Sequence, residues 1–424
     1  MSIFTPFIIV SLMLLNYLLY RKKIYDKKLY ITTSIFILIY TIVAISIYYI
    51  NLHNGFEYGI IYGDLLGNHF CDEYKYYTDA NILYNHLKNG EFSSWINKTL
   101  PIYEFIDSSG HPSYGNYNSY VILLTMLKFI GMHSTLDFIL IKLFVYIPTA
   151  IIIFKLSRLY LNEKKSLIVL IIFSALPGYI LSNSLLMRDN IILLLSCIVI
   201  YYILCKRINL LILIPTILLL IGFRSYLILV FAACLVFTFR NNKKLISKYD
   251  LIYLVLILIA IYLISNFNFS LEHSNIFFSY YQITDLQEKF VSLYGSGILG
   301  IAKLLILTLI HIIIDPVLIN FLTSGNLYFI LFSLGNILSS LLSIIFALKY
   351  LLLSVKLFNL PNEKYILLMK FTAYFTMLTS FIVMSKDGYI INRIALMWLP
   401  LFIIILLIPF NYFYKKRGRL INDF

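Results

Sequence analysis

The chain has 424 residues, of which 61% are hydrophobic and only 13% are charged, and its formal net charge is +14. This composition excludes an ordinary soluble domain and is typical of a protein that crosses a membrane many times. The positive charge does not indicate a nucleic-acid-binding protein, because the basic residues fall in short clusters between apolar runs.

The basic clusters predict how the chain crosses the membrane. They hold 22 of the 34 Lys and Arg residues and lie at 21–28, 155–165, 206–207, 240–248, 349–364 and 415–419. Because Lys and Arg in short loops are retained on the cytoplasmic side, we place all six clusters in the cytoplasm. We then expect eleven spans, with the N-terminus outside and the C-terminus inside, at about 3–20, 29–51, 136–158, 166–184, 189–205, 208–222, 225–239, 250–267, 326–348, 365–384 and 393–412.

Two further apolar segments, 117–131 and 298–314, are also long enough to be considered as spans. If both crossed, the basic clusters between them would face outward. We therefore expect both to be re-entrant or in-plane helices on the outer side, the second ending at Asp315-Pro316, where a helix should break.

The predicted fold is an all-α polytopic membrane protein with one transmembrane domain over 1–424. Two long segments lie outside: 52–135, with amphipathic helices, and 268–325, with the re-entrant segment. These segments and the outer ends of the spans hold 15 of the 20 acidic residues. A transporter usually keeps its loops short and its polar groups near the midplane, so this distribution favours an enzyme at the outer boundary.

A polar helix is predicted within 67–92, in the first outer segment. Its apolar face has the spacing i, i+4, i+7, i+11 and consists of Tyr76, Ala80, Leu83 and Leu87. Asp72 is expected on this packed face, and Glu73 on the adjacent one. Asp72 either caps the helix N-terminus or is a buried acid with a raised pKa that takes a proton from a hydroxyl nucleophile.

The segment that follows, 108–131, begins with Gly and Pro and continues as an aromatic-led helix. His111 in this loop either hydrogen-bonds a sugar or assists proton transfer, or it has only a structural role. Tyrosines such as Tyr76 and Tyr114 suit stacking on sugars, but an interfacial aromatic belt explains them equally well.

Three arginines depart from the positive-inside pattern. Arg188, Arg224 and Arg393 each lie at the outer end of a predicted span, next to apolar sequence. Ionisable groups at such positions usually face a partner or a cavity. The arginines either clamp a diphosphate through their planar forks or extend toward lipid headgroups. Asp189 is a candidate partner of Arg188, although adjacent helical residues point in different directions.

Over about 29–240, the chain resembles membrane glycosyltransferases of the GT-C fold, and most of all the O-antigen and capsule repeat-unit polymerases of the Wzy type. The resemblance rests on the order of "DEYKYYTDANILYNHLKNG", "HPSYGNYNSYVILLTMLKFIG", "ALPGYILSNSLLMRDNIILLL" and "GFRSYLILV". It extends more weakly to "GYIINRIALMWLPLFIIIL" near the C-terminus. The extra N-terminal span, 3–20, and Asp72-Glu73 in place of an Asp-X-Asp motif depart from the pattern.

The resemblance implies a polymerase in the bacterial inner membrane, with its active face outside. Donor and acceptor would both be glycans on polyprenyl diphosphate, and a chain-length regulator protein and membrane lipids would be its partners. Asp72 or Glu73 would assist the attacking hydroxyl, and Arg188, Arg224 and Arg393 would hold the diphosphate. No cofactor is implied, and no metal-ligand cluster is apparent. A transferase of one sugar from a lipid phosphate stays open as an alternative, as does a flippase, which the large acidic outer segments disfavour.

Overall fold

The protein is described by a computed structural model covering residues 2–60, 72–92, 116–205, 209–239, 291–295, 297–313, 327–355, 362–387 and 392–413. Within these ranges every regular element is a helix, which confirms the all-α prediction. The first part of the chain contains α1 (Phe4–Arg21), α2 (Lys27–His53), α3 (Asp72–Lys88), α5 (Asn116–Phe129), α6 (Thr135–Lys142), η1 (Leu143–Val145), α7 (Tyr146–Arg158), α8 (Glu163–Ser174), α9 (Pro177–Ser184), α10 (Asp189–Cys205), α11 (Leu210–Arg224) and α12 (Tyr226–Phe239). The second part contains α15 (Gly297–Ile313), α16 (Leu327–Val355), α17 (Glu363–Asp387), α18 (Asn392–Ala395), α19 (Leu399–Leu407) and η3 (Phe410–Phe413).

Several helices are long and apolar enough to cross a membrane. Among the described residues there are five: Phe4–Arg21, Lys27–His53, Thr135–Arg158, Ile330–Ser354 and Glu363–Ser385. Each coincides with a predicted span. A sixth is obtained if α8 and α9, which meet at 63°, together form one broken span. The chain is therefore a polytopic helical membrane protein by length and composition of its helices.

The predicted number of eleven spans is not confirmed. Helices α10, α11 and α12 are apolar but have 17, 15 and 14 residues, fewer than the roughly 20 that a simple crossing needs. The predicted span 393–412 is divided into α18, α19 and η3. The predicted span 250–267 and most of the second outer segment, 268–325, lie outside the described residues.

The break between α8 and α9 has a local cause. Pro177 is the first residue of α9, and Leu176 before it is extended, with φ −61° and ψ 127°. Proline disfavours the helical conformation in the residue before it and has no N–H to continue a helix. At its other end α9 stops at Ser184, and Leu185 is again extended. A short non-helical segment, 185–188, therefore separates α9 from α10.

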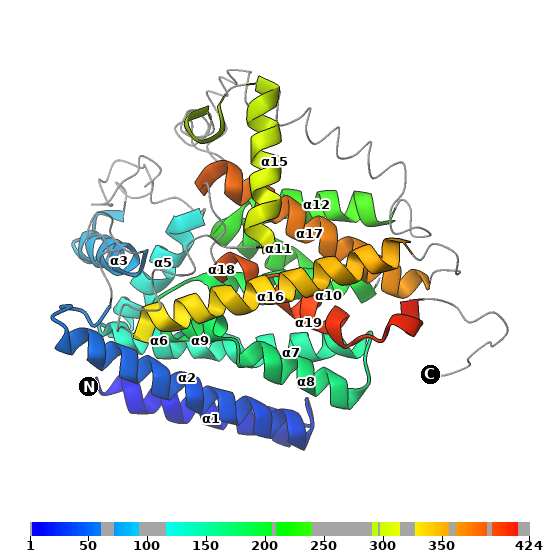
Figure 1. Cartoon of the computed structure of the whole chain (residues 1–424). Coiled ribbons are helices and arrows are strands. Elements are labelled where there is room, and N and C mark those ends of the chain that lie inside the picture. Colours follow the sequence, from blue (N-terminus) through cyan, green and yellow to red (C-terminus); the bar gives the residue numbers. More distant parts are fainter. Residues whose placement is uncertain are drawn as a thin grey trace.

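Helices α1 and α2 run alongside each other at one side of the molecule, whereas α16 and α17 are inclined to each other (Figure 1). Helices α1 and α2 pack side by side, α16 packs on α9 and α19, and α17 packs on α12. Helix α15 packs on α16 and α17 but runs across them (Figure 1). The predicted re-entrant or in-plane position of 298–314 on the outer side stays a prediction.

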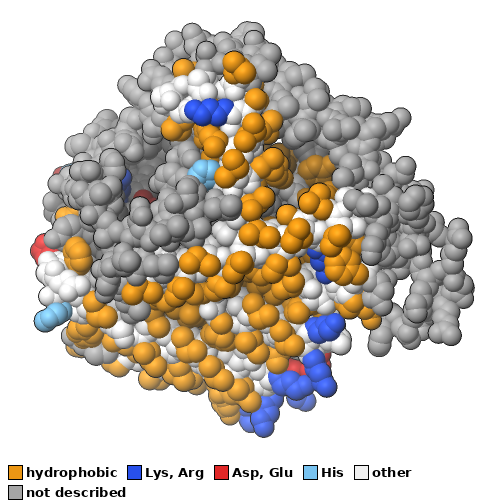
Figure 2. All heavy atoms as spheres, in the orientation of Figure 1, with side chains coloured by type: hydrophobic (Ala, Val, Ile, Leu, Met, Phe, Trp, Pro, Cys, Tyr) orange, Lys and Arg blue, Asp and Glu red, His pale blue; other side chains and the backbone are white. Residues whose placement is uncertain are grey.

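The basic residues near the starts of α2 and α8 lie at one end of the helical body, and the polar helix α3 lies at the other. At one end, Lys28 near the start of α2 forms an ion pair with Glu163 at the start of α8, with 3.1 Å between Nζ and Oε1. Figure 2 shows Lys and Arg side chains gathered at this end of a largely apolar surface. The opposite end carries α3 and α5 (Figure 1). Of the basic clusters, 21–28 and 155–165 lie in the described part of the chain, at the end opposite α3 and α5, whereas 206–207, 240–248 and 415–419 lie outside it.

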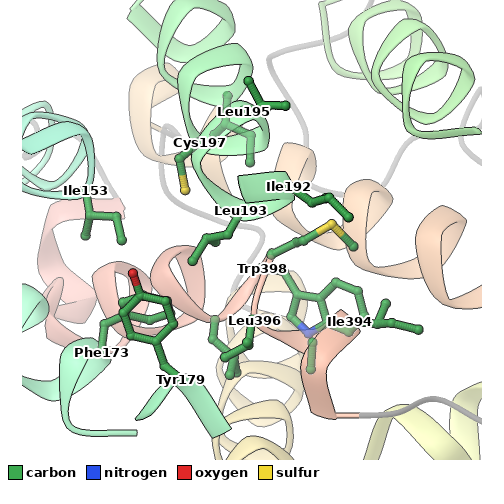
Figure 3. Packing of buried hydrophobic residues seen from close by; sticks show 14 of the residues in the cluster. Ile153, Phe173, Tyr179, Ile192, Leu193, Leu195, Cys197, Ile394, Leu396 and Trp398 are labelled. Carbon is green, nitrogen blue, oxygen red and sulfur yellow. The ribbon is translucent and has the colours of Figure 1, made fainter. Parts of the chain in front are cut away.

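The segment between α18 and α19 packs in the centre of the protein. Leu396 and Trp398 lie against Leu193 of α10 and Tyr179 of α9 (Figure 3), and all four side chains are buried. Because this packing fixes the segment, it also fixes Arg393, which lies just before it. A buried core thus positions one of the three unusual arginines.

Candidate functional site

The three arginines, predicted either to clamp a diphosphate or to extend toward lipid headgroups, lie near the N-terminal end of α3. Arg393 Nη1 lies 2.6 Å from Asp72 Oδ2, and Arg224 Nη2 lies 3.3 Å from Asp189 Oδ1. The Arg188 guanidinium lies 5.9 Å from the centre of the Tyr76 ring. Residues from α3, the α9–α10 connection, α11 and α18 therefore form one charged cluster, which we call the arginine cluster.

The packed face of α3 is nearly as predicted, with one correction. Tyr76, Ala80, Leu83 and Leu87 are all buried. Asp72, however, has a side chain that is 33% exposed, whereas Glu73 is 0% exposed. Position 73 lies three residues before Tyr76 and seven before Ala80, so it belongs to the packed face of α3. Asp72, one residue earlier, lies at the edge of this face. The prediction that Asp72 is the acid on the packed face is wrong, and Glu73 holds that place.

The raised pKa expected for Asp72 is also wrong. Partial burial alone would raise the pKa of this carboxyl, but the charges of Arg393 and Arg188 and the hydrogen bond from Arg393 lower it below its ordinary value of 3.8. Conversely, burial alone would lower the pKa of Arg393, and the charges of Asp72 and Asp189 raise it instead. Asp72 is therefore an anion at neutral pH, held by a distant segment of the chain.

Asp189 pairs with Arg224 and not with its neighbour Arg188. It is the first residue of α10, and its carboxylate reaches the end of α11. Adjacent residues at a helix start project in different directions, which explains why the predicted pair does not form. Arg224 is only 9% exposed. Burial and a carboxylate partner at 3.3 Å argue against a role for Arg224 as a side chain that extends to lipid headgroups.

Arg188 differs from the other two arginines. Its Nη1 donates a hydrogen bond to the Phe223 carbonyl at 3.1 Å. Among the described residues, it is the one arginine of the three that has no carboxylate partner. Its remaining N–H groups and its charge suit an anion, and a guanidinium fork fits phosphate oxygens well.

Tyr76 has a different role from the predicted sugar platform. Its ring is buried, packs edge-on against Tyr120 at 4.9 Å between centres, and faces the Arg188 guanidinium. This leaves little of the ring to stack on a sugar, and the tyrosine supports Arg188. Of the other candidates, His111 and Tyr114 lie outside the described residues.

Glu73 anchors the non-helical segment between α9 and α10. Its Oε1 accepts a hydrogen bond from the Leu186 N–H at 2.5 Å, and Lys142 binds carbonyls of the same segment. Sequence reasoning missed Lys142, although a lone lysine within an apolar run was a signal that it has a partner or a task. No group of three or more His, Cys, Asp or Glu that could hold a metal occurs in the described part of the chain.

These features define a helical membrane protein with several apolar helices and a cluster of paired charges at one end of its body. No family model matches the chain, and no curated protein and no solved structure matches it. The arrangement of the arginine cluster is therefore the basis on which a function is inferred.

Proposed function

We propose that the protein is a glycosyltransferase that joins oligosaccharide repeat units carried on polyprenyl diphosphate. It would act at the outer face of the bacterial inner membrane, as an O-antigen or capsule polymerase. The observation that carries the proposal is the position of Arg188: a guanidinium without a carboxylate partner among the described residues, beside two Arg–carboxylate pairs, at one end of a membrane-spanning helical body.

The charges of the cluster suit a lipid-linked diphosphate. The headgroup of such a lipid lies at the membrane boundary, and from there it would have to reach the cluster at the N-terminal end of α3. Arg188 would bind it first, and Arg224 and Arg393, each paired with a carboxylate, would share their donors between that carboxylate and phosphate oxygens. Charge-assisted hydrogen bonds to the leaving diphosphate strengthen as negative charge develops on it, which lowers the barrier to transfer.

Asp72 would assist the acceptor. The oxygen of an acceptor hydroxyl forms a bond to the anomeric carbon of the donor while the bond from that carbon to the phosphate oxygen breaks. The electron pair leaves with the polyprenyl diphosphate, and the proton of the hydroxyl passes to Asp72 and then to water. The transition state resembles an oxocarbenium ion, so the positive charge on the sugar draws electrons from the attacking hydroxyl and makes its proton more acidic. An ionised carboxylate of low pKa is then basic enough to accept this proton.

The proposal is tested with the purified protein in nanodiscs that contain a synthetic repeat unit on polyprenyl diphosphate. We expect products whose masses rise by whole repeat units, with one polyprenyl diphosphate released for each bond formed. Addition of one sugar from a lipid monophosphate instead would establish the single-sugar transferase. Movement of the intact lipid across the bilayer without new bonds would establish a flippase, and either result contradicts the polymerase.

A further inference from the structure

Two buried lysines occupy equivalent positions in the fold. Each comes from one helix and binds the carbonyl oxygens at the C-terminal end of another helix that stops inside the protein. Lys142 of α6 is 5% exposed and binds the end of α9, and Lys349 of α16 is 6% exposed and binds the end of α19. They lie at opposite ends of the helical body.

Lys142 donates three hydrogen bonds into the connection between α9 and α10. Its acceptors are the carbonyls of Ser182 and Met187, both at 2.8 Å, and the carbonyl of Leu185. The last carbonyls of a helix have no partner within the helix and carry partial negative charge. An ammonium group with three donors satisfies them where water is scarce.

Lys349 does the same at the other break. It donates to the carbonyls of Ile405 at 2.6 Å, Ile408 at 2.5 Å and Leu406 at 3.4 Å. None of these residues belongs to the arginine cluster. The two lysines therefore have matched chemistry but different neighbours.

What distinguishes Lys142 is that its segment carries Arg188. Met187, whose carbonyl Lys142 binds, is directly followed by Arg188, and the N–H of Leu186 donates a hydrogen bond to Glu73. Glu73 and Asp189 are the carboxylates that interact electrostatically with Lys142. The segment is thus held between α3 and α6 at every residue from 185 to 187.

We propose that Lys142 and Glu73 are positioning residues, which hold the segment 185–188 so that Arg188 presents its guanidinium to the phosphates of a lipid-linked diphosphate. This inference rests on the proposed function for its ligand. It assigns Glu73 a different task from proton transfer, because its carboxylate is fully buried and bound to backbone. Neither side chain contacts the ligand; both act through Arg188.

The test compares Lys142→Gln with Lys349→Gln, since both remove an ammonium group from a helix end. The first readout is the affinity of the protein in nanodiscs for farnesyl diphosphate, a short polyprenyl diphosphate without sugar. The second is the rate at which phenylglyoxal modifies Arg188, followed by peptide mass spectrometry. The melting temperature of each variant measures the purely structural cost.

Both variants are expected to melt at lower temperature than the wild type. Lys142→Gln should weaken farnesyl diphosphate binding about tenfold, which corresponds to about 1.4 kcal/mol, and should change the Arg188 modification rate severalfold. Lys349→Gln should leave both values within about twofold of the wild type. When Arg188→Gln is already present, adding Lys142→Gln should weaken farnesyl diphosphate binding by less than about twofold further, because the effects of residues that act as one unit are not additive.

Equal effects of the two lysine variants on binding and on Arg188 modification would overturn the positioning role. If the wild type does not bind farnesyl diphosphate, the result contradicts the proposed function. The modification rate of Arg188 then tests the positioning role by itself. If Lys142→Gln does not fold, Glu73→Leu takes its place. It removes the acceptor of the Leu186 N–H, and an unchanged Arg188 modification rate in that variant would also overturn the inference.

Discussion

Replacing Arg188 with lysine is expected to lower transfer from the lipid-linked donor by about tenfold or more. Lysine keeps the charge but loses the planar fork, so the two parallel hydrogen bonds from one guanidinium to two phosphate oxygens are lost. The loss of one charge-assisted hydrogen bond, about 1.4 kcal/mol or more, corresponds to this change in rate. The measurement is the initial rate of donor consumption in nanodiscs at matched amounts of protein.

The control is Arg158→Lys, at the end of α7 on the opposite side of the helical body, where the side chain is exposed. This change should leave the rate unaltered. The Michaelis constant for the donor should rise in Arg188→Lys, since the residue is expected to bind the diphosphate before and during transfer. A near-normal rate in Arg188→Lys would mean that its guanidinium serves only the fold or the membrane surface, and the diphosphate site would have to be elsewhere.

Asp72→Asn is expected to reduce transfer by about 10²–10⁴-fold, the usual effect of removing a positioned general base. Asparagine keeps the shape of the side chain but cannot take the proton, and it leaves Arg393 without the carboxylate at 2.6 Å. The rate of bond formation is measured in a single turnover with bound donor and acceptor. Glu73→Gln is the matched control, and its smaller expected loss separates the positioning carboxylate from the reacting one.

The pH dependence of kcat/KM gives a second measure of Asp72. Arg393 and Arg188 lower the pKa of Asp72 below 3.8, so the ionised form persists to low pH and activity is lost only as pH falls through this lowered value. In Arg393→Gln the pKa should rise, and the acid limb should move to higher pH. Full activity of Asp72→Asn, or an acid limb that stays in place in Arg393→Gln, would contradict the role of Asp72 in proton transfer.

The parts of the fold predicted from sequence are those that depend on a long, uniform pattern. The apolar helices α1, α2, α16 and α17 each have at least 18 residues, and their hydropathy alone defines them. The predicted span 166–184 includes Pro177, and the hydropathy of the whole segment does not reveal that it is divided into α8 and α9 at this residue. The number of spans could not be predicted because short apolar helices and crossing helices have the same composition.

The sequence singled out the three arginines and the two acids of the arginine cluster, but not the pairs that they form. The unusual depth of Arg188, Arg224 and Arg393 was visible in the sequence because a charge in an apolar run is costly wherever the chain folds. Which carboxylate each arginine binds depends on packing between distant helices, and no spacing encodes it. The exchange between Asp72 and Glu73 has the same origin: neighbouring helical residues differ by about 100°, so a small rotation of α3 decides which of the two is buried.

The most direct test of the proposed site is a structure of the protein in a nanodisc with a repeat unit on polyprenyl diphosphate, captured with an acceptor that lacks its reacting hydroxyl. We predict that the diphosphate lies within hydrogen-bonding distance of Arg188, with Asp72 facing the vacant position of the acceptor hydroxyl. A diphosphate bound away from Arg188, Arg224 and Arg393 would contradict the arginine cluster as the site of transfer.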